Sequence, residues 1–400
     1  MRRIVIVYFD AGGGHRAAAR ALAEGIRRQG RPWQVVSLNL DDVLEPLDPI
    51  YRATGVRGGE LYNRALRMGW TAGSAQVIPL MHGVIRMLHS RQVRLLRDYW
   101  QRLEPDLVVS VVPHFNRALF ESLRAESPRT PFVTVITDLA DYPPHFWFEP
   151  QDQDFICGSE EAAQQARELG AGSGRIWPVS GMILHPRFYE PIQGDRAAER
   201  RALGLHPRLA TGLVMFGGYG SQLMLDIARQ LAVASPRIQL IFLCGRNETL
   251  VRRLRHVKLP FPVHVQGFTE DVVRYMWLSD FFVGKPGPGS VSEALAMRLP
   301  VIVHAGARTM AQERFNVEWI KKQGLGIPVR SIRAIPRVVE ELMRPGVRRR
   351  MLRNIAQLNN RAVFEVPEIL DRILAGHPDS FKTIHHLDVS SDVDQRDIAV

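Results

Sequence analysis

The stretch that most constrains this chain is Gly284–Leu295, with the sequence GKPGPGSVSEAL. It follows the apolar run Trp277–Val283, which predicts a buried strand that ends at the glycine. Two prolines and two glycines in residues 285–289 exclude a helix there, so we expect the helix to begin at Ser290 or later, with Ser290 as N-cap and Glu293 in capping-box spacing. Such a turn leaves backbone N–H groups at the positive end of a helix, which suits a diphosphate; the alternative is a capped turn without a ligand.

A second junction of the same kind follows directly. Pro300–His304 is another short apolar run and predicts a strand, and the polar cluster QERFN after it opens a further helix. Two consecutive junctions of this type suit a nucleotide sugar, because one helix start holds phosphate while the next holds sugar hydroxyls. Glu293, one turn into the first helix, is placed to accept hydrogen bonds from a pair of hydroxyls.

Together the two junctions resemble the donor-site region of GT-B glycosyltransferases. KPGPGSVSEAL, PVIV and QERFN are similar to K-x-G-P-G-T-x-x-E-A, a strand, and G-Q-E-x-x-N in the family that makes monogalactosyl- or glucosyl-diacylglycerol, a family related to the transferase that adds GlcNAc to lipid I. Met310-Ala311 stand where that family has Pro-Gly. The resemblance spans roughly residues 1–375 and implies an α/β GT-B fold, with two Rossmann-like domains facing each other across a cleft.

The N-terminus repeats the pattern of strand, glycine-rich turn and helix, with Ile4–Phe9 as the strand, Asp10–Arg16 (DAGGGHR) as the turn and Ala17–Gln29 as the helix. The turn is neither a dinucleotide fingerprint nor a P-loop, and the helix start favours a neutral His15. On the residues alone, His15 either caps the turn or acts as a base. The turn resembles the family's A/T-G-G-G-H-R, which implies that His15 lies in the cleft as the base for the acceptor hydroxyl. The resemblance also implies an acceptor or phosphate loop of Gly12, Gly13, Gly14 and Arg16.

Two apolar runs, Asp106–Val112 and Phe132–Thr137, predict buried parallel strands whose carboxyl ends face the cleft. After the first strand the family has His-Pro where this chain has Val112-Pro113, so no role is carried over to a histidine there. The second strand ends in Thr-Asp-Leu, as in the family. Asp138 is predicted to orient His15 or to contact the acceptor, and a turn-capping aspartate is the alternative.

Residues 41–103, between the N-terminal unit and the strand Asp106–Val112, have the composition of a membrane-facing surface. Asp41–Ala75 carries apolar and aromatic residues among glycines and arginines, and it fits a membrane-inserting element, a lid or ordinary packing. Val77–Leu103 has the period of an amphipathic helix, with apolar residues on one side and arginines on the other. This helix fits either binding to anionic lipid or ordinary packing, with one face on the core and solvated arginines on the other. The net charge of +11 indicates an anionic partner, and in the absence of a nucleic-acid-binding signature we expect an anionic membrane surface rather than nucleic acid.

A second domain begins with the predicted strand Gly212–Phe216 and a further glycine-rich turn, Gly217–Ser221, which matches the family's G-G-x-G. By resemblance, Phe268 at the end of the strand Val263–Phe268 meets the base of the nucleotide. The predicted divisions are an acceptor domain at 1–185, a linker at roughly 185–205, a donor domain at 205–345, a terminal helix at 350–375 that crosses back to the first domain, and a disordered polar tail at 376–400.

Neither a metal nor another cofactor is expected. The D-x-D strings at 152–154 and 392–394 precede a strand or lie in the tail, so we interpret both as incidental. Two cysteines are too few for a disulfide framework, and no run approaches the length of a membrane-spanning helix. These features predict a cytoplasmic protein that is peripheral on the inner face of the cell membrane.

The predicted function is inverting transfer of a hexose, glucose or galactose, from a UDP-sugar to diacylglycerol or a related lipid. Lys285 and the glycine-rich turns would stabilise the leaving diphosphate in place of a metal, Glu293 would bind ribose, and Gln312 and Glu313 would bind the transferred sugar. A GT-B transferase with another lipid or small-molecule acceptor, a UDP-sugar 2-epimerase and a non-catalytic binding protein are the alternatives. The predicted donor-binding residues are Gly217, Gly218, Gly220, Ser221, Phe268, Lys285, Gly287, Pro288, Gly289, Ser290, Glu293, Gln312, Glu313 and Asn316.

Overall fold

The computed structural model describes residues 1–10, 13–48, 51, 55, 74–142, 145–234, 237–306 and 309–376. Three parts of the sequence-based prediction therefore lie outside the described residues: Gly12 of the predicted phosphate loop, much of the segment 41–75, and the tail beyond Gly376.

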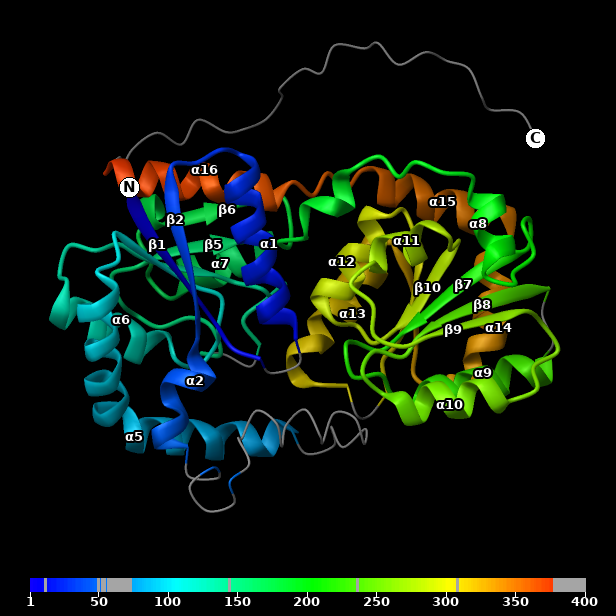
Figure 1. Ribbon diagram of the computed structural model, residues 1–400, viewed down its shortest axis with the longest axis horizontal. Coiled ribbons are helices and arrows are strands. Elements are labelled where there is room, and N and C mark those ends of the chain that lie inside the picture. Colours follow the sequence, from blue (N-terminus) through cyan, green and yellow to red (C-terminus); the bar gives the residue numbers. More distant parts are fainter. Residues whose placement is uncertain are drawn as a thin grey trace, which may run out of the picture.

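The chain forms two parallel sheets, each with six strands, which lie side by side in Figure 1. The first has the order β2-β1-β3-β4-β5-β6 and the second the order β12-β11-β10-β7-β8-β9. The strands of the first sheet are β1 (Arg2–Tyr8), β2 (Trp33–Asn39), β3 (Leu107–Ser110), β4 (Phe132–Val135), β5 (Asp154–Cys157) and β6 (Ile176–Pro178). Those of the second are β7 (Ala210–Met215), β8 (Ile238–Leu243), β9 (Val263–Gln266), β10 (Phe281–Gly284), β11 (Val301–His304) and β12 (Gly326–Val329). Two parallel sheets of this kind confirm the predicted two-domain α/β class.

Helices cover both faces of each sheet, which explains why the central strands are continuous apolar runs. Residues 4–7 of β1 and 281–283 of β10 are completely buried. The helices of the first domain are α1 (Gly14–Arg28), α2 (Leu40–Leu44), α5 (Ser74–Leu103), α6 (Asn116–Glu126) and α7 (Glu160–Glu168). Those that follow are α8 (Arg196–Ala202), α9 (Leu223–Ala234), α10 (Glu248–His256), α11 (Val272–Trp277), α12 (Pro288–Ala296), α13 (Ala311–Gln323), α14 (Ile335–Met343), α15 (Pro345–Ala356) and α16 (Ala362–Ala375).

Several elements differ from the sequence-based prediction, among them α11 and the terminal helix. Trp277 ends helix α11 rather than starting a strand, because the strand begins only at Phe281, after a turn in which Ser279 Oγ donates to the Tyr275 carbonyl. The terminal helix predicted at 350–375 is in fact two helices, α15 and α16, separated by residues 357–361.

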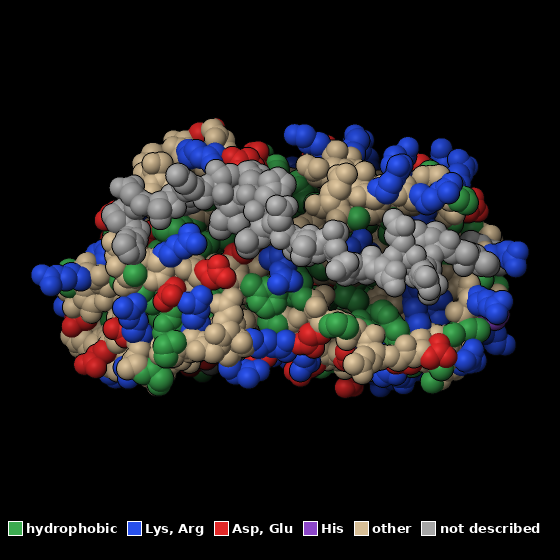
Figure 2. All heavy atoms as spheres, turned by 90° about the horizontal axis from the view of Figure 1, so that it is seen from above, with side chains coloured by type: hydrophobic (Ala, Val, Ile, Leu, Met, Phe, Trp, Pro, Cys, Tyr) green, Lys and Arg blue, Asp and Glu red, His purple; other side chains and the backbone are tan. Residues whose placement is uncertain are grey.

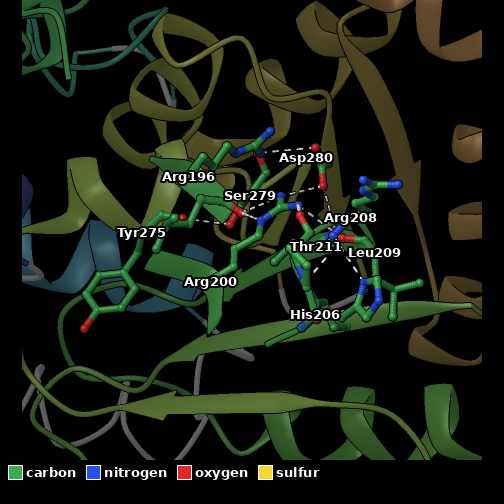
Figure 3. A network of polar contacts seen from close by, with 12 residues as sticks. Arg196, Arg200, His206, Arg208, Leu209, Thr211, Tyr275, Ser279 and Asp280 are labelled. Carbon is green, nitrogen blue, oxygen red and sulfur yellow. Dashed lines mark hydrogen bonds and ion pairs between the residues drawn. The ribbon is translucent and has the colours of Figure 1, made fainter. Parts of the chain in front are cut away.

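The segment predicted as a linker contains helix α8, which a buried ion pair fastens to the second sheet. Arg200 is 4% exposed, and its guanidinium lies 2.9 Å from the carboxylate of Asp280, directly before β10. Its Nε also donates to the Leu278 carbonyl at 3.0 Å. Figure 3 shows this network, in which Asp280 also accepts the backbone N–H of Thr211 at 2.8 Å. Helix α8 is therefore part of the second domain, although it lies in the segment that was predicted to be a linker.

Helix α16 returns to the first domain and packs against α1. Gln29 donates to the Phe364 carbonyl at 2.7 Å, and Arg31 forms an ion pair with Asp371 at 2.7 Å. A β-carbon on Gly25 would lie 2.7 Å from the Val363 carbonyl oxygen, so only glycine allows α1 to approach α16 this closely. The predicted crossing back to the first domain is therefore made by α16.

Candidate functional site

His15 lies in the first turn of α1, at the carboxyl end of the first sheet. Its Nδ1 atom is 2.9 Å from the carbonyl oxygen of Val111, which follows β3, and 3.2 Å from the hydroxyl of Thr137, which follows β4. A carbonyl oxygen only accepts hydrogen bonds, so Nδ1 carries the proton and Nε2 keeps its lone pair. His15 is thus held as the tautomer that can accept a proton at Nε2.

Aromatic rings enclose the His15 imidazole. The ring centroids of Phe9 and Trp147 lie 5.0 and 5.7 Å away. Burial lowers the pKa of His15 to about 4. The hydrogen bond to the Val111 carbonyl raises this pKa, but by less than burial lowers it. The side chain is nevertheless partly exposed, so the neutral imidazole reaches solvent.

The predicted loop before His15 is only partly described. Gly13 is the N-cap of α1 in a left-handed conformation, with φ of 85°, and Gly14 begins the helix. Arg16 forms an ion pair with Asp10 at 2.6 Å, which joins the two ends of the turn. The α-carbon of Gly14 is exposed, so the backbone is accessible at this helix start.

Asp138 does not hydrogen-bond to His15 in the structure. One of its oxygens accepts the indole N–H of Trp147 at 2.9 Å, and Trp147 in turn packs against His15. Asp138 is 7% exposed, and burial raises its pKa to about 7. The orienting role predicted for Asp138 thus belongs to the Val111 carbonyl, and Asp138 acts on His15 only through the indole.

Asp138 also marks the place where the two domains meet. Its pKa is raised further by the charge of Glu313 and lowered by that of Lys285, both of which belong to the second domain. Because such charge effects fall off with distance, Asp138 in the first domain lies near the Lys285–Glu313 pair of the second domain, more than a hundred positions further along the chain.

Helix α12 begins earlier than predicted. Gly287 is its N-cap and Pro288 its first residue, so Ser290 lies inside the helix rather than capping it. Proline suits the first helical position because its φ is already helical and its missing N–H would have no partner there. No side chain caps this helix start, and its backbone N–H groups therefore remain available to an anion.

Lys285 lies across the start of α12 and pairs with Glu313, at a distance of 2.9 Å. Glu313 is 4% exposed and lies in the first turn of α13, the helix at the second junction. Gly287 lies close to this pair. A β-carbon added at Gly287 would be 3.3 Å from Lys285 Cε and 3.5 Å from Glu313 Oε1. A glycine at 287 therefore leaves room for the ion pair beside the helix start.

The other predicted residues of the second junction have different positions. Asn316 is completely buried and donates to the Pro286 carbonyl at 2.8 Å, which fixes the loop before α12, while its Oδ1 atom has no hydrogen-bond partner among the described residues. Gln312 is partly exposed, and its buried Oε1 atom has no hydrogen-bond partner among the described residues. A buried acceptor without a partner is unusual and suits a hydroxyl-bearing ligand.

Glu293 lies on the second turn of α12, and burial raises its pKa to about 7. No ion pair with another described residue involves this carboxyl. A carboxyl in that environment gains from hydrogen-bond donors, and two adjacent hydroxyls supply them.

The glycine-rich turn after β7 approaches a second turn closely. Gly217 and Gly220 have φ of 76° and 61°, and Ser221 accepts the N–H of Leu223 at the start of α9. A β-carbon on Gly245 would lie 2.1 Å from the Gly218 carbonyl oxygen, and the Arg246 N–H donates to the same oxygen at 2.9 Å. The open α-carbon of Gly218 gives a ligand access to this backbone.

Phe268 follows β9 and is 49% exposed, with the Arg246 guanidinium 4.9 Å from its ring centroid. The pair offers a flat, cationic surface beside the glycine-rich turn. Arg246, like Val111 and Trp147, was missed by the sequence-based prediction; a basic residue three positions after the apolar strand at 238–243 was the signal available for it.

Helix α5 reaches the site from the acceptor side. Nε2 of His82 lies 2.6 Å from Nδ1 of His114, which has a positive φ of 68° in the turn between β3 and α6. His114 is packed against Phe146, and burial lowers its pKa to about 3. The buried side of α5 is fixed by Trp100, which donates to Ser122 at 2.8 Å.

The two aspartates of the first D-x-D string, Asp152 and Asp154, form contacts with other side chains. Asp152 pairs with Arg175 at 2.8 Å, and Asp154 accepts the indole N–H of Trp177 at 2.8 Å. Within the residues that the structure describes, no group of three or more His, Cys, Asp or Glu side chains is placed to hold a metal ion. Among those same residues, no helix has the length and apolar character needed to cross a membrane.

Two family models match successive parts of the chain. Residues 15–179 match monogalactosyldiacylglycerol synthase, and residues 213–372 match the C-terminal domain of glycosyltransferase family 28. The chloroplastic monogalactosyldiacylglycerol synthase of Spinacia oleracea is 28% identical over 392 residues, which cover 93% of this chain and 73% of that protein. Synthase 1 of Arabidopsis thaliana is 28% identical over 358 residues, which cover 86% of this chain and 65% of that protein.

Solved structures show the same fold at low identity. MurG of Acinetobacter baumannii superposes with a TM-score of 0.56 at 14% identity and covers 93% of this chain and 100% of its own. UDP-GlcNAc 2-epimerase of Neisseria meningitidis has a TM-score of 0.60 at 12% identity, with 94% and 100% covered. With its two matched domains and the fold of a GT-B glycosyltransferase, the chain is a glycosyltransferase that resembles the monogalactosyldiacylglycerol synthases over most of its length.

Proposed function

We propose that this glycosyltransferase moves a hexose, galactose or glucose, from a UDP-sugar to diacylglycerol or a related lipid at a membrane surface, with inversion at the sugar carbon. The names of its relatives support the galactosyl donor and the diacylglycerol acceptor. The observation that carries the proposal is the placement of His15, with its free Nε2, beside Trp147 and Asp138, whose pKa responds to the charges of Lys285 and Glu313.

The reaction is a single displacement. The acceptor oxygen forms a bond to the anomeric carbon while the bond from that carbon to the diphosphate breaks, and the acceptor proton passes to Nε2 of His15. A pKa of about 4 keeps His15 in the base form at neutral pH but makes it a weak base, so we expect proton transfer to follow bond formation to the sugar. Attack from the side opposite the leaving group gives inversion.

Positive charge for the leaving diphosphate comes from Lys285 and the uncapped N–H groups of α12. Glu293 binds the ribose hydroxyls, and Gln312 and Glu313 bind the hexose. We propose that these groups take the place of a metal ion, so that a chelator such as EDTA leaves the rate unchanged.

The membrane surface is supported by the exposed side of α5. Met87 is 75% exposed there, and four arginines lie on the same helix in exposed positions, Arg86, Arg91, Arg94 and Arg97. Arginine near an anionic bilayer contributes about 1 kcal/mol for each residue close to the surface. Figure 1 places α5 along one edge of the molecule, clear of both sheets.

The test is mass spectrometry of the lipid products. The purified protein is incubated with UDP-galactose or UDP-glucose and with diacylglycerol in anionic liposomes, alongside a His15→Ala variant. A hexosyl-diacylglycerol peak that the variant lacks is the expected result. UDP release without a lipid product would move the acceptor to another molecule, and formation of a free 2-epimerised sugar would replace the proposal with an epimerase.

A further inference from the structure

A polar pocket lies at the far end of the second sheet from the donor loops. It has a volume of about 230 Å³ and lies between α8, the start of β10, the turn after α12 and the start of α15. Its lining residues are Arg196, Trp277, Ser279, Asp280, Met297, Arg298, Leu299 and Arg348. We call it the arginine pocket.

Cations outnumber anions in the arginine pocket. Asp280 lies 3.1 Å from Arg196, 3.5 Å from Arg348 and 2.9 Å from the buried Arg200, so one carboxylate is shared by three guanidinium groups. The single charge of Asp280 balances one of the three guanidinium charges. The other two positive charges are partly desolvated and have no matching anion among the described residues that line the pocket. Arg298, at the rim, adds a further charge.

Two donors in the pocket lack partners. The Nε atoms of Arg196 and Arg348 are buried, and neither has a hydrogen-bond partner among the described residues. A buried N–H group without an acceptor is costly, and a small movement of either side chain towards an anion in the pocket would remove that cost. Arg348 lies in the first turn of α15, whose N-cap residue, Arg344, provides no side-chain cap.

We propose that the arginine pocket binds a phosphate group carried by a small soluble molecule. Arginine pairs with phosphate through two parallel hydrogen bonds, and the unpartnered Nε atoms are of the kind that supply one bond of such a pair. The positive end of the α15 dipole adds to the attraction. The pocket has space for a phosphate and several waters, since one water occupies about 30 Å³.

The position of the pocket favours a soluble ligand over a lipid headgroup. In Figure 1, α8 and α15 lie along the edge opposite α5, the helix that we propose faces the membrane. Figure 2 looks down on that opposite edge, where Lys and Arg side chains gather over the half that carries the second domain. Helix α8 lies on the connection out of the first domain, and α15 lies on the connection back to it. A phosphate bound between Arg196 and Arg348 would therefore hold these two connecting segments together.

Binding of inorganic phosphate, measured by isothermal titration calorimetry at fixed ionic strength with chloride as the competing anion, tests this site. The variants are Arg298→Gln and Arg348→Gln, and the charge-matched control is Arg350→Gln, which lies on α15 but does not line the pocket. UDP is present at saturation, so that phosphate does not report on the donor loops. We expect both pocket variants to bind phosphate at least tenfold more weakly than the wild type and the control.

Equal loss of affinity in Arg350→Gln, or no loss in the two pocket variants, would overturn the proposal. A second measurement identifies the source of the phosphate. Sedimentation with vesicles of phosphatidate in phosphatidylcholine is expected to be the same for wild type and Arg298→Gln. Weaker sedimentation of the variant, with free phosphate binding unchanged, would assign the pocket to a lipid and also overturn the proposal. The thermal midpoint of each variant in chloride shows whether it is folded.

Discussion

Lys285 and Glu313 form an ion pair of 2.9 Å that joins the two junctions between strand and helix in the second domain. The first junction offers uncapped N–H groups and the second offers a buried carboxylate, so the pair places a cation between the proposed diphosphate and the proposed sugar.

Replacement of Lys285 by alanine is expected to lower kcat/KM for the UDP-sugar by roughly a hundredfold, the effect of removing one strong donor to a developing negative charge. UDP affinity should fall as well, because the diphosphate is itself an anion. Steady-state kinetics and calorimetry with UDP measure both. Lys258→Ala, an exposed lysine of the same domain, is the control and should match wild type. Unchanged UDP affinity in the Lys285 variant would exclude contact with the diphosphate.

Glu293 predicts a pH dependence of donor binding. Its pKa of about 7 means that the carboxyl is largely protonated at pH 6 and ionised at pH 8. The ionised form accepts stronger hydrogen bonds, and accepts them at both oxygens, so UDP affinity should rise with pH through about 7 and then level off. Calorimetry at pH 6, 7 and 8 gives the profile. The difference between wild type and Glu293→Gln isolates this group from the titration of UDP itself, and a constant difference would argue against ribose binding by Glu293.

Asp138 predicts a gain in stability on neutralisation. Its pKa rises from 3.8 in the unfolded chain to about 7 in the fold, so the folded state holds the proton more tightly. Stability therefore falls as pH rises from about 4 through 7, and the full cost is present at pH 8. Asp138→Asn keeps an acceptor for the Trp147 indole, and it should be about 1–4 kcal/mol more stable than wild type at pH 8 but equal to it near pH 4.

Urea unfolding at the two pH values measures this difference. Equal stability of both proteins at pH 8 would contradict the raised pKa. If the carboxylate contacts the acceptor, the more stable variant should also be less active, and product mass spectrometry would report that loss.

Gly25 and Gly83 form a matched pair of helical glycines. Alanine normally stabilises a helix interior by about 1 kcal/mol relative to glycine, and Gly83 on α5 has open space for the added methyl. At Gly25 the methyl would lie 2.7 Å from the Val363 carbonyl, so the substitution should instead destabilise by about 1–3 kcal/mol. Thermal unfolding of both variants tests the contact between α1 and α16, and stabilisation by both would show that the helices do not pack so closely.

Local residue patterns carried much of the fold. Buried parallel strands are continuous apolar runs, and the glycine-rich turns after 4–9, 212–216 and 277–283 lie close to where the sequence placed them. The start of α12 was misplaced because Pro288 was taken to exclude a helix, whereas proline favours the first helical position.

The parts of the site that could not be predicted depend on contacts between segments far apart in the chain. Such contacts leave little trace in a single sequence. The partner that fixes His15 is the carbonyl of Val111, and every residue type has a carbonyl. Asn316 was predicted to bind the donor by resemblance to the family's motif, and the contact of its amide with the Pro286 carbonyl could not be foreseen from that motif. The sharing of Asp280 among three arginines likewise depends on which helices meet, which no periodicity encodes.

The return of α16 to α1 means that the first domain is discontinuous in sequence, and the second domain is an insertion within it. Residues 1–185 and 362–376 then form one unit, so synthesis of the first domain is not complete until the second has already emerged. The order of folding should follow from this: the second domain closes on itself first, while the first remains without the helix that covers α1. Two separately expressed fragments, divided between 190 and 195, should therefore reassemble through α16, which the second fragment carries and the first domain lacks without it.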